Sequence, residues 1–308
     1  MSWQWRCYRR QFRDPLITTH GPWATREGLI LRWEPSPGTV HYAEIAPIPW
    51  LGSETLAAAM GFCQHACQDD PRTLTVPNTL PATQFALSWL RDPWSDLGWT
   101  APTCILLGRA CTAPHRWQPD VTVVKVKIGV DSLPTEQAAL ASLPTDLVIR
   151  LDANGGLSDA EAHNWLEWAA LRPQIEFLEQ PLPPVQINRM RQLAAHYPTP
   201  IALDESLITL EDLAQLDDWP DIVVLKPSLL GSPIALKQYC QGQPVDGVIS
   251  SALETAIGLA AVQRVGQHLA PWLKHQRAWG LGSPTLFNDN WHQITPDQLW
   301  GSLSPGIL

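Results

Sequence analysis

Residues 123–129 read VVKVKIG and residues 148–155 read VIRLDANG, two short runs of apolar residues that each end in charged side chains. Four similar runs follow: IEFLEQP at 175–181, IALDES at 201–206, IVVLKPS at 222–228 and VISSALET at 248–255. Runs rich in Val, Ile and Leu that alternate with helical stretches indicate parallel strands covered by helices. At least six such units predict a closed (β/α) TIM-type barrel.

The predicted strands are Val121 to Ile128, Asp146 to Asp152, Ile175 to Glu179, Pro200 to Asp204, Asp221 to Lys226 and Gly247 to Ser251. An open, doubly wound sheet is the alternative architecture. It would be favoured by a glycine-rich dinucleotide loop after an early strand, and no G-x-G-x-x-G occurs in the sequence.

The chain before the barrel has a different pattern. Strand-like runs at Glu27 to Trp33 and Thr39 to Ile45 precede an alanine-rich helix that we expect to begin at Ser53, with the serine side chain as its cap. We therefore predict three parts: an α+β capping domain at 1–100, a catalytic (β/α) barrel at 101–285, and a C-terminal segment at 286–308 that returns to the cap.

Composition limits the function. The net charge is −9, from 21 Lys and Arg against 30 Asp and Glu, so no general attraction to nucleic acid is expected. No apolar run approaches the length of a membrane span, and the N-terminus lacks the apolar core of a secretory signal. The six cysteines are scattered and are expected to be free thiols. These features predict a cytoplasmic protein that acts on a small molecule; they leave its oligomeric state open and are compatible with a monomer.

Three carboxylates end consecutive predicted strands. Asp152, Glu179 and Asp204 are 27 and 25 positions apart, which is close to one βα unit each. In a barrel of this type the active site lies at the C-terminal ends of the strands, so the three should converge. Crowded carboxylates need a cation, and ligation by oxygen alone favours Mg²⁺. The alternative is that each acid is an ordinary capping or surface residue.

Lysines end two of the other strands. Lys125 and Lys127 flank Val126 and share one face of their strand, because strand side chains alternate. A neighbouring ammonium and a nearby metal both lower the pKa of a lysine, so Lys127, nearer the rim, is the predicted general base. Lys226, before Pro227, should lie across the barrel mouth from it. A metal between two lysines suits removal of a proton α to a carboxylate. Solvated lysines on an edge strand are the alternative.

These residues resemble the enolase superfamily, and within it the muconate-lactonising subgroup, which has K-x-K on the second barrel strand and a lysine on the sixth. The fold implied is the modified (β/α)7β barrel with its capping domain, which here contains REGLILRW and Glu44. Within the subgroup the chain is most similar to the o-succinylbenzoate synthase family, because of Arg150, SSALETAIG from Ser250 and GLGS at 280–283. That family forms o-succinylbenzoate by dehydration in menaquinone or phylloquinone synthesis.

The resemblance implies a role for each residue. Asp152, Glu179 and Asp204 would bind Mg²⁺, Lys127 would move the proton in a syn elimination, Lys226 would stabilise the enediolate, and Lys125 would tune Lys127. Ser250, Ser251 and Arg150 would contact the carboxylate substrate, although Arg150 has a structural ion pair as its alternative. Asn154, Glu205 and Glu254 would form an outer layer, with capping or surface roles as the alternative.

Related activities set the competing predictions. Dipeptide epimerases carry Asp-x-Asp at the eighth strand, whereas this chain reads AWGLGS there, and VISSALET lacks the seventh-strand histidine base of mandelate-racemase-type members. The cap also departs from the pattern, since HYAE stands before Ile45 in place of a glycine–tryptophan–glycine-like turn. Racemisation of N-succinylamino acids, or another reaction of the muconate subgroup, remains an alternative. A catalytically silent barrel is the alternative without enzyme activity.

Overall fold

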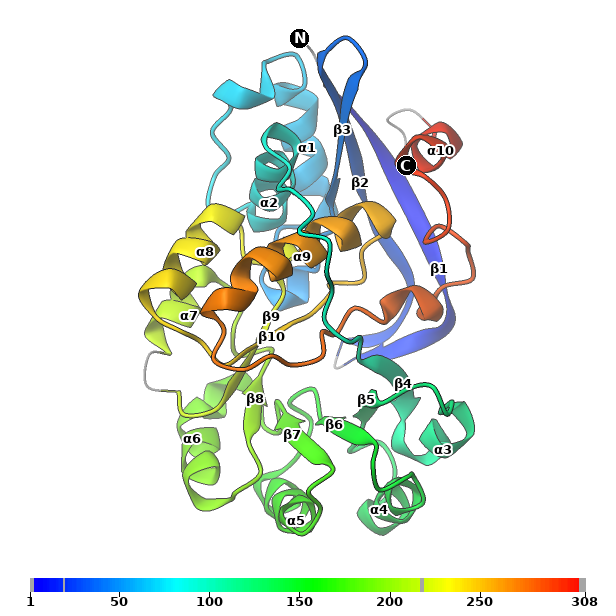
Figure 1. Cartoon of the computed structure of the whole chain (residues 1–308), viewed down its shortest axis with the longest axis vertical. Coiled ribbons are helices and arrows are strands. Elements are labelled where there is room, and N and C mark those ends of the chain that lie inside the picture. The colour runs from blue at the N-terminus through cyan, green and yellow to red at the C-terminus, as the bar shows by residue number, and fades with distance from the viewer. Residues whose placement is uncertain (1–2, 19, 217–218, 305–308) are drawn as a thin grey trace.

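The computed structural model describes residues 3–18, 20–216 and 219–304. These residues form two sheets, a three-stranded antiparallel sheet near the N-terminus and a seven-stranded parallel sheet. Figure 1 shows the antiparallel sheet and its helices at one end of the molecule and the parallel sheet with its surrounding helices at the other.

The N-terminal sheet consists of β1 (Gln4–Thr18), β2 (Gly21–Ser36) and β3 (Thr39–Ile45), with β2 in the centre. Helices α1 (Leu56–Ala66) and α2 (Pro81–Arg91) pack on it, and the short η1 (Pro49–Leu51) and η2 (Pro71–Thr73) lie in the connections. β2 and β3 lie where the sequence predicted strands, although β2 is longer than expected, and β1 was not among the predicted runs.

The predicted start of α1 is wrong. The helix begins at Leu56, and the hydroxyl of Thr55 caps it by accepting a hydrogen bond from the Ala58 amide at 3.2 Å. The Ser53 hydroxyl instead accepts from the Ile48 amide at 2.6 Å. Ser53 therefore closes the preceding turn, which the local cap preference of serine could not reveal.

Seven parallel strands form the barrel wall in sequence order, each joined to the next by a helical connection. The strands are β4 (Ile105–Arg109), β5 (Val123–Lys127), β6 (Val148–Asp152), β7 (Ile175–Glu179), β8 (Ile201–Leu203), β9 (Ile222–Leu225) and β10 (Gly247–Ile249). The connecting and flanking helices are η3 (Ala110–Thr112), α3 (Ala113–Arg116), α4 (Leu133–Ala141), α5 (Asp159–Ala170), η4 (Pro184–Gln186), α6 (Ile187–His196), α7 (Leu210–Gln215), η5 (Pro227–Leu229), α8 (Pro233–Gly242), α9 (Ala256–Leu269) and η6 (Ala270–Trp272).

The first strand of the barrel, β4, was not among the six predicted runs. Its pairing with β5 shifts register between Leu106 and Gly108, and Gly108 has a φ of 82°. A glycine in this conformation interrupts the alternation of a strand. The short sequence ILLGR therefore carried too little pattern to be recognised.

Residues 279 and 280 close the barrel in the place of an eighth strand. Gly280 forms a parallel bridge with Ser250 after β10, and Trp279 forms one with Thr103 before β4. The Gly280 amide donates to the Ile249 carbonyl at 2.8 Å, and the Cys104 amide donates to the Trp279 carbonyl at 2.8 Å. These bonds join the two edges of the seven-stranded sheet.

The floor of the barrel is apolar. Phe177, Ala202, Ile222, Val224 and Val248 form a separate buried cluster. Because strand residues two apart face the same side, the residues two positions after four members of this cluster face the interior one layer nearer the rim. Those residues are Glu179, Asp204, Lys226 and Ser250.

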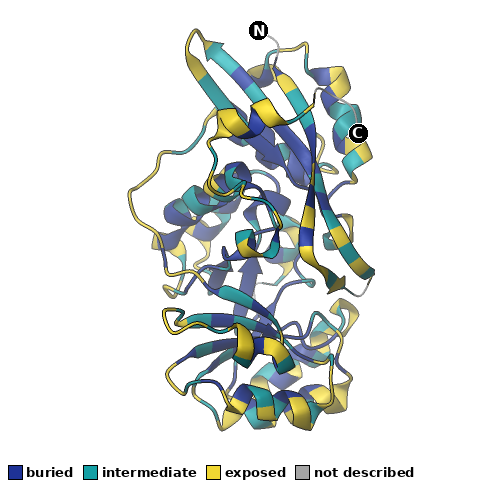
Figure 2. Cartoon of the chain, turned by 90° about the vertical axis from the view of Figure 1, so that its right-hand side faces the viewer, coloured by how far each residue is buried: buried dark blue, intermediate teal, exposed yellow. Residues whose placement is uncertain are grey.

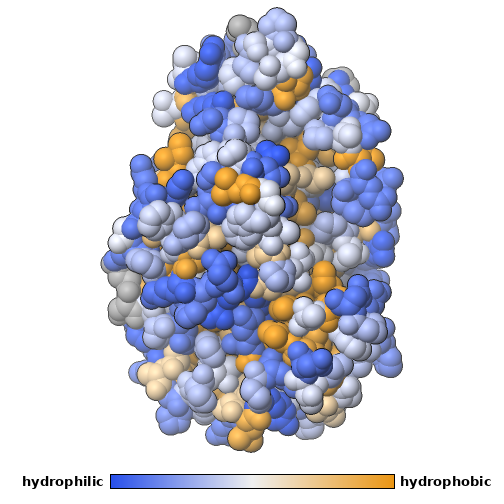
Figure 3. All heavy atoms as spheres, in the orientation of Figure 1, coloured by the Kyte–Doolittle hydropathy of each residue, from blue (hydrophilic) through white to orange (hydrophobic). Residues whose placement is uncertain are grey.

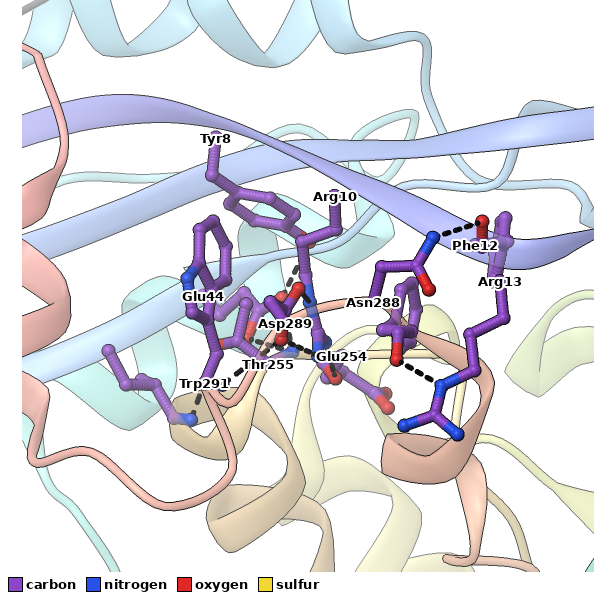
Figure 4. A network of polar contacts seen from close by, with 12 residues as sticks. Tyr8, Arg10, Phe12, Arg13, Glu44, Glu254, Thr255, Asn288, Asp289 and Trp291 are labelled. Atoms are coloured by element: carbon purple, nitrogen blue, oxygen red, sulfur yellow. Dashed lines mark hydrogen bonds and ion pairs between the residues drawn. The ribbon is translucent and has the colours of Figure 1, made fainter.

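The chain after the barrel includes η7 (Ser283–Leu286) and α10 (Pro296–Ser302) and lies against β1. The Arg10 guanidinium binds the Asp289 carboxylate at 2.8 and 2.9 Å and stacks on Phe287, and the Asn288 side chain donates to the Phe12 carbonyl (Figure 4). Residues far apart in the sequence are thereby joined at the boundary between the N-terminal sheet and the barrel.

The surface is mixed. Buried residues run through the barrel strands and the middle of the N-terminal sheet, while exposed residues lie on the outer helices and loops (Figure 2). On the face shown in Figure 3, apolar side chains occur in small groups among polar ones. In the described part of the chain, no helix has the length and apolar character needed to span a membrane.

Candidate active site

The charged residues predicted from the strand ends lie together at the barrel rim. Lys127, Asp152 and Glu179 are Cα partners in the adjacent strands β5, β6 and β7. Asp204 follows β8 directly. Lys226 follows β9 and forms an ion pair with Asp204. The register of a parallel sheet therefore delivers one carboxylate from the end of each of three consecutive strands to the same place.

Lys125 lies one layer below this rim and reaches up to the carboxylates. Its Nζ is 2.8 Å from Asp152 Oδ2 and 2.8 Å from Glu179 Oε1. Burial acts to lower the pKa of Lys125, but the charges of Asp152, Glu179 and Asp204 outweigh it and raise the pKa well above its usual value. The contacts with Asp152 and Glu179 therefore favour the charged form of Lys125 inside the barrel.

Two of the carboxylates, Glu179 and Glu205, remain short of positive charge despite the lysines. At Asp204, by contrast, burial is outweighed by positive charge, chiefly that of Lys226, which lowers the pKa. Burial, followed by the charge of Asp152, raises the pKa of Glu179 to about 8. Burial and the charges of Asp204 and Asp152 raise the pKa of Glu205 to about 7. Raised carboxylate pKa values mean that the site disfavours its own negative charge. A further cation at this position would relieve the repulsion.

The ammonium groups of two lysines hold the rim carboxylates in place. Among the residues that the structure describes, no three acidic, histidine or cysteine side chains are disposed as a metal-binding group. Lys125 instead bridges Asp152 and Glu179, and Lys226 pairs with Asp204. The donors are all carboxylate oxygens, which is the chemistry that Mg²⁺ prefers.

Lys127 differs from its neighbour on the strand. Its ammonium group donates a hydrogen bond to the backbone carbonyl of Ile17 in β1 at 2.6 Å, so the N-terminal sheet reaches over the barrel mouth at this point. Partial burial lowers the pKa of Lys127, and the charge of Lys125 lowers it further. A lysine with a lowered pKa at the rim can serve as a general base.

Lys226 lies across the barrel from Lys127, because β8, β7 and β6 separate β9 from β5 in the sheet. Burial acts to lower the pKa of Lys226, but Asp204 and Glu179 outweigh it and raise the pKa above its usual value. Beside it is a small pocket whose walls include Leu51 from the cap and Asp204, Glu205 and Leu229 from the barrel.

The loop after β10 holds the two predicted serines. Ser250 donates its amide to the Leu225 carbonyl at 2.8 Å, and Ser251, which is buried, donates its amide to the Gly280 carbonyl at 3.0 Å. The Glu254 carboxylate accepts from the Ala252 amide at 2.9 and 3.0 Å and from the Ser228 hydroxyl. Glu254 therefore joins the serine loop to the segment that follows Lys226.

Asn154 and Arg150 occupy different layers. The Asn154 amide nitrogen Nδ2 donates to Glu205 Oε1 at 3.2 Å, and its backbone amide donates to Asp152 Oδ1 at 3.0 Å. Arg150 is only 1% exposed; its Nε donates to Glu176 Oε2 at 2.6 Å, and its guanidinium lies 5.0 Å from the Phe177 ring centre. Arg150 thus lies beside the apolar floor and pairs with Glu176, whereas the alternative stated for it from the sequence was a rim carboxylate as structural partner.

Two residues of the site were missed by sequence reasoning. Gln180 directly follows Glu179 and bonds to the loop that carries Asp204, and Ser228 bonds to Glu254. Both stand within quoted strand-end motifs, IEFLEQP and IVVLKPS, so their position near the site was readable. Their partners come from other loops, and no local pattern specifies such contacts.

Comparison with known proteins gives the family. A family model described as enolase C-terminal domain-like matches residues 112–268. An o-succinylbenzoate synthase from Thermosynechococcus vestitus is 40% identical over 283 residues, which cover 85% of this chain and 87% of that protein. The chain belongs to the o-succinylbenzoate synthase family of the enolase superfamily. The family resemblance predicted from the strand-end motifs is confirmed.

Solved structures of the superfamily agree with the fold. The o-succinylbenzoate synthase structure from Thermosynechococcus elongatus, a complex with Mg in its active site, matches with a TM-score of 0.85 at 36% identity and covers 98% of this chain and 100% of that chain. A dipeptide epimerase from Enterococcus faecalis matches with a TM-score of 0.76 at 19% identity, covering 94% and 91%, and shows the fold alone. The predicted fold class is confirmed.

Proposed function

We propose that this chain catalyses the reaction of its family, as a Mg²⁺-dependent carbon–oxygen lyase. It would convert 2-succinyl-6-hydroxy-2,4-cyclohexadiene-1-carboxylate to o-succinylbenzoate and water, in menaquinone or phylloquinone synthesis. The observation that carries the proposal is the placement of Lys127 and Lys226 on opposite sides of three rim carboxylates. The 40% identity to a named synthase across most of both chains supports it.

Asp152, Glu179 and Asp204 would hold the Mg²⁺. The residues fit the ion, because all three offer carboxylate oxygens and the raised pKa of Glu179 reflects a local shortage of positive charge. When bound, Mg²⁺ supplies the charge that makes an α-proton of a carboxylate substrate more acidic. Lys125 and Lys226, which now pair with these carboxylates, would have to release them in part.

Lys127 would carry out both proton transfers. As a neutral amine it takes the α-proton from carbon, and as an ammonium group it returns a proton to the departing hydroxyl, so that water leaves and the ring becomes aromatic. One group serving both transfers requires both to occur on one face, which gives a syn elimination. Its lowered pKa supports the first step because it increases the neutral fraction.

Lys226 would act from the opposite face. Burial acts to lower the pKa of Lys226, but Asp204 and Glu179 outweigh it and raise the pKa, which favours the protonated form, whereas the pKa of Lys127 is lowered. A fixed positive charge at this position stabilises the negative charge that develops as the α-proton leaves, and it can contact the ring face as a cation. The two lysines thus divide the work between a base and a fixed cation.

The remaining predicted residues complete the proposal. Ser250 and Ser251 would bind the succinyl carboxylate, while Asn154, Glu205 and Glu254 would support the rim from behind, where they make the hydrogen bonds described above. Arg150 would influence the substrate only from the apolar floor of the barrel, because its guanidinium pairs with Glu176 there. We also propose the division into a cap at 1–100, a barrel at 101–285 and a returning segment at 286–308, and a cytoplasmic location.

The test supplies the cyclohexadiene substrate with Mg²⁺ and follows the absorbance of the aromatic product. Lys127→Ala should lower kcat by roughly 10²- to 10⁴-fold, the range for loss of a general acid or base, with the circular dichroism spectrum and Mg²⁺ binding unchanged. Loss of folding in this variant would make the lysine structural. Absence of product, together with racemisation of an N-succinylamino acid, would replace the proposal by the alternative activity.

A further inference from the structure

Gln180 has an unusual backbone. It follows Glu179 at the end of β7, it is fully buried, and its φ is +37°. Residues other than glycine rarely adopt positive φ, and such conformations persist only where surrounding contacts hold them. The contacts that hold Gln180 in this conformation therefore indicate what the residue does.

The side chain of Gln180 is fully used. Its Oε1 accepts from the backbone amides of Asp204 at 3.0 Å and Ser206 at 3.1 Å. Its Nε2 donates to the Leu182 carbonyl at 2.9 Å and to the Ser206 hydroxyl at 2.8 Å. The amide group therefore fixes the backbone of the loop that carries Asp204.

The backbone of Gln180 makes two further hydrogen bonds, one to β8 and one to the loop after Asp152. Its amide donates to the Ala202 carbonyl of β8 at 2.8 Å, and its carbonyl accepts from the Gly155 amide at 2.7 Å. Gly155 lies three positions after Asp152. One buried residue thus ties together the three loops that carry Asp152, Glu179 and Asp204.

We propose that Gln180 is a positioning residue for the metal, an inference that rests on the proposed function because it takes these three carboxylates as the Mg²⁺ ligands. The side chain sets the spacing between Glu179 and Asp204, and the backbone carbonyl sets that between Glu179 and the Asp152 loop. Partners of this kind orient metal ligands, and their loss typically weakens metal affinity 10- to 100-fold.

Only a side-chain amide of this length can make the hydrogen bonds to Leu182, Asp204 and Ser206 together. Methionine would fill the space but leave the Asp204 and Ser206 amides without an acceptor. Asparagine tolerates positive φ, so it should keep the backbone conformation, but it is one methylene too short to reach both amides. The two variants therefore separate the role of the side chain from that of the backbone.

The experiment measures Mg²⁺ affinity by isothermal titration calorimetry without substrate, in the full chain and in the Gln180→Met and Gln180→Asn variants. We expect the dissociation constant to rise about 10- to 100-fold in both. Thermal unfolding in EDTA should stay cooperative, while the increase in Tm on adding a fixed Mg²⁺ concentration should shrink. Gln84→Met is the matched control: Gln84 also donates to two acceptors, the Val76 carbonyl and Asn78, but lies in the cap. Its Mg²⁺ affinity should equal that of the unmodified chain.

The outcomes are distinct. Folded Gln180 variants that bind Mg²⁺ as tightly as the unmodified chain would overturn the inference, whatever their activity. Failure of both variants to fold, with and without Mg²⁺, would overturn it as well and assign Gln180 to the fold. An unmodified chain that binds Mg²⁺ but forms no aromatic product would refute the proposed function and leave the weakened Mg²⁺ binding of the variants as evidence for positioning.

Discussion

Glu44 offers a quantitative test of how the cap is attached to the barrel. This β3 residue is 3% exposed and places its carboxylate at the N-terminus of α9, close to Tyr8 and Thr255 (Figure 4). It accepts from the Tyr8 hydroxyl at 2.6 Å, from the Thr255 amide at 2.9 and 3.0 Å and from the Gly258 amide at 2.9 Å, and also from the Thr255 hydroxyl. A cap residue thus supplies the acceptors that the first turn of a barrel helix requires.

The structure predicts different costs for two substitutions. Glu44→Ala leaves two backbone amides and two hydroxyls buried without acceptors; each orphaned donor costs about 1–3 kcal/mol, and because the losses overlap we expect roughly 3–5 kcal/mol in total. In Glu44→Gln the remaining oxygen can serve Thr255 and Gly258, and the new amide can donate to the Tyr8 hydroxyl. The charge is lost and the Tyr8 hydroxyl proton loses its acceptor, so we expect roughly 1–2 kcal/mol.

Urea unfolding followed by circular dichroism measures these free energies, with the m-value as the check that the unfolded state is unchanged. Tyr8→Phe removes one donor and should cost about 1 kcal/mol. A Glu44→Ala cost below about 1 kcal/mol would contradict the argument from orphaned donors. So would a Glu44→Gln variant as unstable as Glu44→Ala, because the reasoning depends on the remaining oxygen satisfying the donors of Thr255 and Gly258.

Three further predictions concern the site. In saturating Mg²⁺, kcat/KM should rise with pH around a midpoint below the ordinary lysine pKa of about 10.4, because burial and Lys125 lower the pKa of Lys127. Lys125→Met removes a positive charge and should move this midpoint to higher pH. A midpoint that moves to lower pH in this variant would refute the assignment of Lys127 as the base. Gly52→Ala would place its Cβ 1.4 Å from Ile208 Cγ2, so the cap segment must shift from the barrel rim and KM should rise. Gly38→Ala is the control: Gly38 also has a positive φ, of 81°, but open space around it, so KM should stay unchanged. Chelation by EDTA should abolish activity reversibly, and Mg²⁺ at about 100 times its dissociation constant should stabilise the chain by about 2.7 kcal/mol, which differential scanning calorimetry can check.

The strand ends were predictable because two local rules fix them. Alternation places Lys125 and Lys127 on one face, and the common direction of parallel strands brings Asp152, Glu179 and Asp204 to one rim. Neither rule depends on knowing the rest of the fold. The sequence therefore predicted both the barrel and the charged cluster that the structure brings together.

Contacts between distant segments were not predictable in this way. The pairing of Arg150 with Glu176 depends on a register shift between β6 and β7, and the bonds of Gln180 depend on a positive φ. The hydrogen bond from Lys127 to Ile17 depends on how the cap sheet lies over the barrel. No periodicity in the sequence encodes contacts between distant segments, so these contacts could be identified only in the three-dimensional structure.

The different behaviour of Lys125 and Lys127 follows from a single step along one strand. Two residues of a strand span roughly 6.6 Å, which is enough to place Lys125 within 2.8 Å of Asp152 and Glu179 while Lys127 bonds to a cap carbonyl. Carboxylate contact raises the pKa of the first, and burial with the charge of the first lowers the pKa of the second. A K-x-K strand beside three carboxylates therefore gives its two lysines pKa shifts of opposite direction without any difference in residue type. Because the deeper lysine bridges two carboxylates, which favours its charged form, we propose Lys127 as the base, and exchanging Lys127 for arginine should abolish proton transfer even though the positive charge is kept.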